Sequence, residues 1–204
     1  QEHRSYSLIS LEPHGKLSYE LLQFNLMASD PQRVVYLDPF LRKTAKRLCG
    51  EDVLGEDFTF VFNPFDLPRK TPDAINYATQ ELSYGLFEVL ESEGASRQMK
   101  ALVRACVSTL LVNDGMSISD LKRFMDDDDN HDLVQAGLKN PNEEHRKLFT
   151  RFDHSSINPT KSGIYYRLLS LIDDIHLRRI LVGKSTVDIE QEMNAGKIII
   201  CNLA

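Results

Sequence analysis

Phe58-Thr59-Phe60-Val61-Phe62-Asn63-Pro64-Phe65 is the stretch at which the character of the chain changes. Its alternating aromatic residues have the two-residue period of a β-strand, and Asn63-Pro64 ends that strand because proline lacks the amide donor that a sheet needs. Before this stretch, short apolar runs alternate with helical segments, whereas the pattern after it is helical almost to the end. We therefore expect the chain to leave a sheet at about residue 65.

Two further strands are predicted ahead of this stretch. Residues 6–11 form an apolar run closed by Glu12-Pro13-His14-Gly15, and residues 33–37 form another closed by Asp38-Pro39. Helical segments at residues 17–28 and 40–48 lie between the strands, and this alternation predicts βαβ units in a parallel sheet covered on both faces. Ligands of such sheets bind at the carboxyl ends of the strands, where Glu12, Asp38 and Asn63 are expected to cluster. These residues either border a nucleotide site or simply form turns beside proline.

The part of the chain after residue 65 is predicted to be an all-helical insertion. Two long apolar stripes have helical spacing and are interpreted as packing faces. Shorter helices are expected near residues 118–125, 131–138 and 142–152, a long one from 159 to about 178, and a last one at 186–193. Ser117 with Asp120, and Ser185 with Asp188, have the spacing of helix-capping pairs. Residues 197–202 then read as a returning strand, so the predicted domains are a partial α/β domain at 1–65, the all-α insertion at 66–195 and the returning strand at 196–204.

The composition of the chain argues against several classes of function. The chain has 204 residues and a net charge of −6, which offers no global attraction for nucleic acid, so any DNA contact needs a local basic patch. Its three cysteines are far apart and contain no C-x-x-C pair, which argues for a reducing compartment and against a zinc site. No apolar run approaches the roughly 20 residues that span a bilayer. We interpret the chain, which begins without methionine, as a segment of a longer protein.

Several short motifs resemble chemical sites but lack their context. Gly183-Lys184-Ser185-Thr186 has the tail of a phosphate loop, yet Arg178 stands where the pattern needs glycine, and the segment joins two predicted helices. The acidic run at residues 126–132 departs from the calcium-loop template and is interpreted as a solvated loop. Asp153-His154-Ser155 has the letters of a hydrolase triad without its G-x-S-x-G elbow.

Two basic groups are candidates for contacting phosphates. One is the short helix carrying Arg42, Lys43, Lys46 and Arg47, which is either a solvated face or a phosphate-contacting patch. The other flanks residues 152–159, and from it we select Lys161, Arg167 and Arg151 as candidates for contacting DNA. The alternative for this second group is that its charges balance nearby acidic residues.

The order of motifs resembles the central part of the HerA/FtsK-type P-loop ATPases, and most closely the coupling ATPases of conjugative type IV secretion. The resemblance is carried by Leu11-Glu12-Pro13-His14-Gly15-Lys16, by Tyr36-Leu37-Asp38-Pro39, by Phe62-Asn63-Pro64-Phe65 and by Gly196-Lys197-Ile198-Ile199-Ile200-Cys201-Asn202-Leu203. Glu12 stands where the family usually has Asp. The resemblance covers most of the chain and depends on motif order, without a catalytic signature.

The resemblance implies a hexameric motor that hydrolyses ATP with Mg²⁺ to move DNA, at the cytoplasmic face of the inner membrane together with other secretion components. It implies that Glu12, His14 and Asp38 border the nucleotide site of the parent protein, and that the all-α domain engages DNA or a DNA-bound protein substrate. The phosphate loop and the Asp-Glu strand end are absent from residues 1–204, so this chain alone is expected to be inactive and to hold no cofactor. A stand-alone helical adaptor that binds protein is the alternative, and a metal-dependent enzyme built on the acidic run is a third hypothesis.

Overall fold

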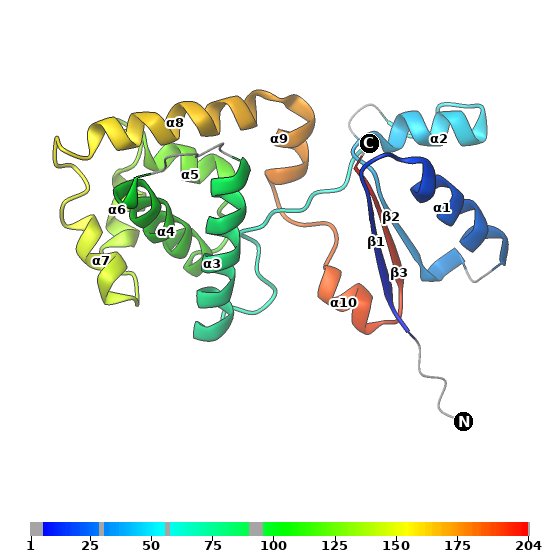
Figure 1. The fold of residues 1–204 in the computed structure, drawn as a ribbon, viewed down its shortest axis with the longest axis horizontal. Coiled ribbons are helices and arrows are strands. Elements are labelled where there is room, and N and C mark those ends of the chain that lie inside the picture. Colours follow the sequence, from blue (N-terminus) through cyan, green and yellow to red (C-terminus); the bar gives the residue numbers. More distant parts are fainter. Residues whose placement is uncertain (1–5, 29–30, 56–57, 90–95, 204) are drawn as a thin grey trace. The chain divides into compact units, whose positions relative to one another are not determined.

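The chain is a mostly helical α/β protein with a small parallel sheet (Figure 1). The computed structural model describes residues 6–28, 31–55, 58–89 and 96–203. They form two compact units: Gln1–Phe62 with Ser185–Ala204, and Asn63–Lys184. The second unit is continuous in sequence, whereas the first is assembled from both ends of the chain. This division leaves the last helix with the sheet, although the sequence placed that helix in the insertion.

The sheet of the first unit has three parallel strands in the order β1-β3-β2. They are β1, Leu8–Glu12; β2, Val34–Leu37; and β3, Ile198–Asn202. Leu8 and Val34 both pair with Ile198, from opposite sides. The predicted return of the chain to its first sheet is therefore confirmed, and the returning strand takes the central position.

The prediction of a strand at residues 58–62 is wrong. These residues form no strand, and Val61 instead pairs with Thr186: its carbonyl accepts the Thr186 N–H at 3.0 Å, and its N–H donates to the Thr186 hydroxyl at 3.0 Å. Phe58 is 55% exposed and Phe62 is 43% exposed, so the aromatic alternation is not buried by a sheet on one side. The β-branched run of β3 provides the central strand instead. Ile199 and Ile200 are both fully buried and point to opposite faces of the sheet.

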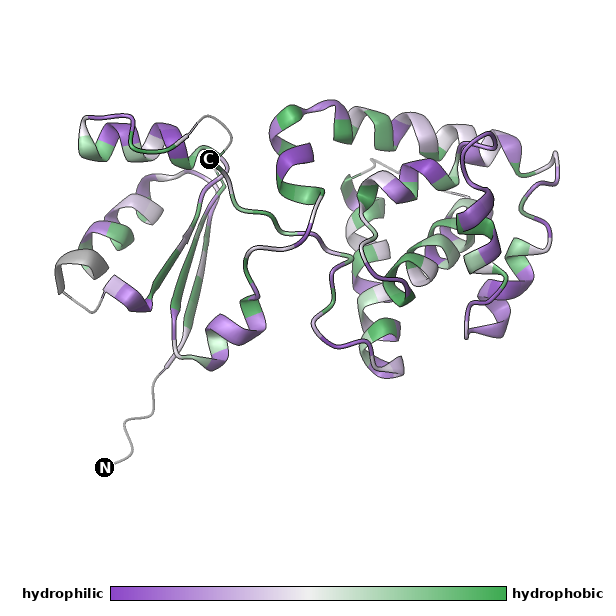
Figure 2. Ribbon diagram, turned by 180° about the vertical axis from the view of Figure 1, so that it is seen from behind, coloured by the Kyte–Doolittle hydropathy of each residue, from purple (hydrophilic) through white to green (hydrophobic). Residues whose placement is uncertain are grey.

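Helices flank the strands in the first unit. They are α1, Lys16–Ala28; α2, Leu41–Cys49; and α10, Ile189–Asn194, with a 3-10 turn at Pro31–Arg33. Helix α1 packs against all three strands and α10 contacts β3. Helix α2 ends at Gly50, whose φ of 75° is the left-handed conformation that glycine adopts most readily. Figure 2 shows hydrophilic and hydrophobic segments alternating along α2.

The last helix is capped differently from the prediction. Asp188, and not Ser185, is its N-cap residue, with its carboxylate accepting the Gln191 N–H at 3.0 Å. Just before this helix, Thr186 forms hydrogen bonds with the backbone of Val61. A helix starting at residue 186 would have to give up that pairing.

The second unit consists of seven helices within the described residues: α3, Pro72–Val89; α4, Arg97–Val112; α5, Ile118–Phe124; α6, His131–Gly137; α7, Glu143–Phe149; α8, Asn158–Asp173; and α9, Ile175–Leu181. Helix α4 lies at the centre, with every position from Leu102 to Leu111 buried except Arg104. The predicted stripes of α3 and α4 are confirmed as packing faces, since both contribute to one hydrophobic core. The Ser117–Asp120 capping box is also confirmed.

The long C-terminal helix of this unit is shorter than predicted. Asp174 leaves the helical conformation and caps α9, accepting the N–H groups of His176 at 2.8 Å and Leu177 at 3.0 Å. A side chain that can satisfy two otherwise unpaired donors favours a new helix start at this point. Of the described helices, none combines the length and apolarity needed to cross a membrane.

Asn63 belongs to the helical unit. It is buried, its amide nitrogen donates to the carbonyls of Met116 at 2.7 Å and Gly183 at 2.9 Å, and its amide oxygen accepts the Phe65 N–H at 3.1 Å. This side chain therefore joins three loops of its own unit. It does not serve as the strand-end ligand residue that the sequence suggested.

Candidate functional site

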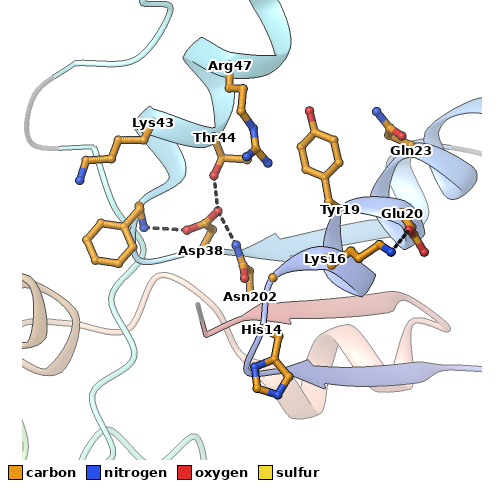
Figure 3. Close-up of a pocket in the computed structure, with 12 residues that line it drawn as sticks. His14, Lys16, Tyr19, Glu20, Gln23, Asp38, Lys43, Thr44, Arg47 and Asn202 are labelled. Atoms are coloured by element: carbon orange, nitrogen blue, oxygen red, sulfur yellow. Dashed lines mark hydrogen bonds and ion pairs between the residues drawn. The ribbon is translucent and has the colours of Figure 1, made fainter.

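A cavity of about 760 Å³ lies at the carboxyl ends of the strands in the first unit (Figure 3). Each strand contributes residues at or just beyond its end: His14 and Gly15 follow β1, Asp38 and Phe40 follow β2, and Asn202 is the last residue of β3. The rest of the lining comes from α1 and α2: Lys16, Tyr19, Glu20, Gln23, Lys43, Thr44 and Arg47. This is the position at which α/β sheets generally bind their ligands.

The loop after β1 is fixed by its own residues. The Glu12 carboxylate accepts the N–H of His14 at 2.8 Å, and the Glu12 carbonyl accepts the N–H of Leu203 at 2.9 Å. Gly15 then adopts a φ of 76°, which turns the chain into α1. Of the predicted residues on this loop, His14 lines the cavity, whereas Glu12 shapes the loop without contributing lining surface.

Asp38 organises the floor of the cavity. It is fully buried, and its Oδ1 accepts the Phe40 N–H at 2.7 Å while its Oδ2 accepts the Thr44 hydroxyl at 2.6 Å. Oδ2 also accepts the Asn202 amide at 3.0 Å and the Tyr36 hydroxyl at 3.2 Å. Figure 3 shows the contacts of Thr44, from α2, and Asn202, from β3, converging on the carboxylate. Four donors nearly fill its lone pairs, so Asp38 holds β2, β3 and α2 together and is not an open ligand for a metal.

The surroundings of Asp38 affect Tyr36. Burial, and next the nearby negative charge of Asp38, raise the pKa of Tyr36 to about 12. The phenol therefore stays protonated at neutral pH and serves as a hydrogen-bond donor.

Three cations line the same cavity. The Arg47 guanidinium lies 4.5 Å from the centre of the Tyr19 ring, and the Lys43 ammonium lies 4.9 Å from the centre of the Phe40 ring. Lys16 forms a long ion pair of 3.9 Å with Glu20, one turn further along α1. In Figure 3, Arg47 and Tyr19 face each other from α2 and α1. The combination of cations and the start of α1 suits an anion better than a neutral ligand.

The three residues selected for DNA contact differ in their exposure to solvent. Lys161 is buried, where it pairs with Asp127, donates to the Phe152 carbonyl at 3.2 Å and lies 4.7 Å from the centre of the Phe152 ring. Its ammonium is enclosed by protein, so the choice of Lys161 as a DNA contact is corrected. Arg151 and Arg167 are exposed. The sequence missed this because a lysine at a helical surface position and one at a core position look alike.

The acidic run is held by cations of its own unit. Asp127 pairs with Lys161, while Asp120, Asp129 and Asp132 surround Arg123. Among the described residues, no group of three metal-ligating side chains is gathered at one place.

Sequence reasoning missed most of the cavity wall. Lys16, Tyr19 and Asn202 were not selected, and Arg47 was noted only as part of a basic helix. One signal was available: Asn202 is the polar residue that ends an apolar strand, the same pattern that drew attention to Asp38. Comparison with protein-family models, with curated proteins and with solved structures gave no match to this chain.

Proposed function

We propose that this chain is the central part of a DNA-translocating ATPase of the HerA/FtsK type, related to the coupling ATPases of conjugative type IV secretion. The observation that carries the proposal is the path of the chain. It leaves a parallel sheet after β2, builds a helical unit at Asn63–Lys184, and re-enters the same sheet as its central strand. A nucleotide-binding sheet interrupted by an all-α domain is the arrangement expected for such a motor.

In this proposal His14 and Asp38 border the nucleotide site of the parent protein. Both lie at the carboxyl edge of the sheet, where His14 lines the cavity and Asp38 fixes its floor. ATP and Mg²⁺ would be bound by a phosphate-loop lysine and a carboxylate contributed by residues outside 1–204. The parent would act as a hexamer at the cytoplasmic face of the inner membrane, with other secretion components.

The reading frame that encodes this chain tests the proposal. We expect a phosphate loop shortly before Gln1 and an apolar strand ending in Asp-Glu after Ala204, and DNA-stimulated ATP hydrolysis by the full product. A frame that lacks both motifs would overturn the proposal, whatever this chain binds by itself.

The helical unit is proposed to engage DNA or a DNA-bound protein. Arg151 and Arg167 are the exposed cations that remain from the predicted set. A fluorescence-anisotropy titration of chain 1–204 with duplex DNA, repeated at several salt concentrations, tests the DNA contact. Replacing both arginines by glutamine should flatten the salt dependence by about one unit of slope for each lost phosphate contact. Lys139→Gln, at another exposed cation of this unit, is the control.

A protein-binding adaptor is the second candidate. Tyr77 and Tyr84 are 68% and 65% exposed on α3, seven residues apart and therefore on one side of the helix. Exposed tyrosines are frequent in protein interfaces, and the burial of Lys161 removes one cation from the DNA candidates. No DNA binding even at about 50 mM salt, where phosphate contacts are strongest, would favour this candidate.

A further inference from the structure

A second cavity, of about 560 Å³, lies within the helical unit. Its wall is made by the first two turns of α3, the second half of α4, and the loop that leads into α7. All the residues that line it belong to the same compact unit, Asn63–Lys184. None of the residues considered above for nucleotide, DNA or protein contact lies in this wall.

Two hydroxyl groups in the wall are almost fully buried and keep some hydrogen-bonding capacity. Ser108 on α4 is 4% exposed; its oxygen accepts the Asn140 amide at 3.3 Å, while its O–H has no acceptor among the described residues. Thr79 on α3 is 3% exposed; its O–H donates to the Ile75 carbonyl at 2.6 Å, and no described residue donates to its oxygen. A buried O–H without an acceptor is unfavourable unless a molecule in the cavity reaches it. The wall therefore offers one donor and one acceptor, from two helices that pack against each other.

His145 adds a third polar group, at the start of α7. Its Nδ1 is enclosed and has no hydrogen-bond partner within the part of the chain that the structure describes. Burial, and next the nearby charge of Arg104, lower the pKa of His145. The imidazole is therefore uncharged at neutral pH and does not attract an anion.

The charges of the wall also disfavour an anionic ligand. Lys70 is the one lysine or arginine that lines the described wall, and its ammonium already binds the Asp114 carboxylate at 2.6 Å and the Asn113 carbonyl at 2.7 Å. Asp73, in the first turn of α3, adds a negative charge. A simple ammonium ligand fits no better, because it has no acceptor for the Ser108 O–H. The wall thus favours a neutral group that carries a donor beside an acceptor.

We propose that this cavity binds a neutral carboxamide group, whose carbonyl accepts the Ser108 O–H and whose N–H donates to Thr79. Ile75 and Val112 line the same cavity and supply apolar contacts for the carbon skeleton of the ligand. The volume of about 560 Å³ falls within the range of small-molecule pockets. Small amides carry such a group, and so do the glutamine and asparagine side chains of a peptide. The inference goes beyond the proposed motor and does not depend on it, because it uses residues of the helical unit alone.

Titration of chain 1–204 with benzamide and with benzoate, followed by two-dimensional NMR, tests the proposal. The two probes have the same ring and nearly the same shape, but benzoate is anionic and has no donor. We expect saturable shifts at the backbone amides of Thr79, Ser108 and His145 with benzamide, and about tenfold weaker binding of benzoate. Ser108→Ala and Thr79→Val should each weaken benzamide binding about fivefold, since each removes one hydrogen bond at nearly constant volume.

Ser83→Ala is the matched control. Ser83 lies one turn beyond Thr79 on α3, is fully buried, has a hydroxyl without a partner among the described residues, and does not line the cavity. This change should leave the affinity for benzamide within about twofold. The NMR spectrum of each variant reports directly whether the fold is retained.

A third probe, N-acetylglutamine methylamide, distinguishes the two sources of the carboxamide. Tighter binding of this probe than of benzamide would support a peptide side chain, and tighter binding of benzamide would support a small amide. Binding of benzoate as tight as that of benzamide would overturn the proposal. Equal weakening by Ser83→Ala, or the absence of saturation with every carboxamide probe, would overturn it as well.

Discussion

The ion pair between Lys161 and Asp127 has one buried and one exposed partner. The side chain of Lys161 is 2% exposed and that of Asp127 is 50% exposed. Removal of Asp127 leaves an ammonium inside the protein whose partners, among the described residues, are the Phe152 carbonyl and ring. Removal of Lys161 leaves a carboxylate that water already reaches. Removal of Asp127 and removal of Lys161 are therefore expected to lower the free energy of unfolding by different amounts.

We expect Asp127→Asn to lower the free energy of unfolding of the helical unit by about 3 kcal/mol, the usual cost of leaving a buried charge unpaired. Lys161→Met should lower this free energy of unfolding by less, because the methionine can fill the same space without a charge. Urea unfolding followed by circular dichroism measures both. Asp128→Asn, at the next position of the acidic run, is the control. A loss from Lys161→Met as large as that from Asp127→Asn would contradict this account.

Tyr36 gives a prediction at alkaline pH. Its folded-state pKa of about 12 lies above the ordinary value of 10.0, so the folded state holds the phenol proton more tightly than the unfolded state does. The stability from this group is complete below pH 10 and is lost as the pH rises towards 12. Unfolding measurements at pH 8 and at about pH 10.5 should show a smaller loss of stability in Tyr36→Phe than in the parent. The exposed Tyr84→Phe controls for the removal of a phenol, and an equal reduction there would contradict the assignment.

At the scale of the helices, replacement of glycine by alanine is expected to have opposite effects on stability at two positions. A Cβ added to Gly137 on α6 would lie 2.5 Å from the ring of Phe149 on α7, whereas one added to Gly85 on α3 would meet nothing within 4 Å. Gly85→Ala should stabilise the helical unit by about 1 kcal/mol through helix propensity. Gly137→Ala should destabilise it by about 2 kcal/mol through overpacking. Thermal unfolding of both variants decides the matter, and destabilisation by Gly85→Ala would contradict the packing described for α3.

The helices also show which elements the sequence predicts well. The stripe of α4 and the capping box at Ser117 follow from side chains a few residues apart, so both were predictable. The break at Asp174 and the shift of the last cap to Asp188 were not, because each depends on which of several possible caps the rest of the unit selects. The segment at residues 58–62 was mistaken for a strand because aromatic alternation shows strand propensity without showing a partner.

At the scale of the molecule, β3 is the element on which the first unit depends. β1 and β2 each pair with β3 and not with one another. Removal of residues 197–204 should therefore unfold the sheet and its helices while leaving Asn63–Lys184 intact, since that unit has its own hydrophobic core. Hydrogen exchange should show protection lost in β1 and β2 and kept in α4. Residues 63–184 expressed alone should melt cooperatively, and a failure to fold would show that this unit needs the sheet.

The sequence by itself determined the alternation of strands and helices at the start, the helical character of the middle, the strand at the end, and the polar residues that close the strands. These are properties of neighbouring residues, set by periodicity, proline and capping. Only the tertiary structure decided that β3 lies between β1 and β2, that residues 58–62 stay outside the sheet, that Lys161 is buried, and that Arg47 packs on the Tyr19 ring in the wall of a cavity. Each of these results from competition among segments far apart in the chain for the same partners and the same buried space, which no local pattern records.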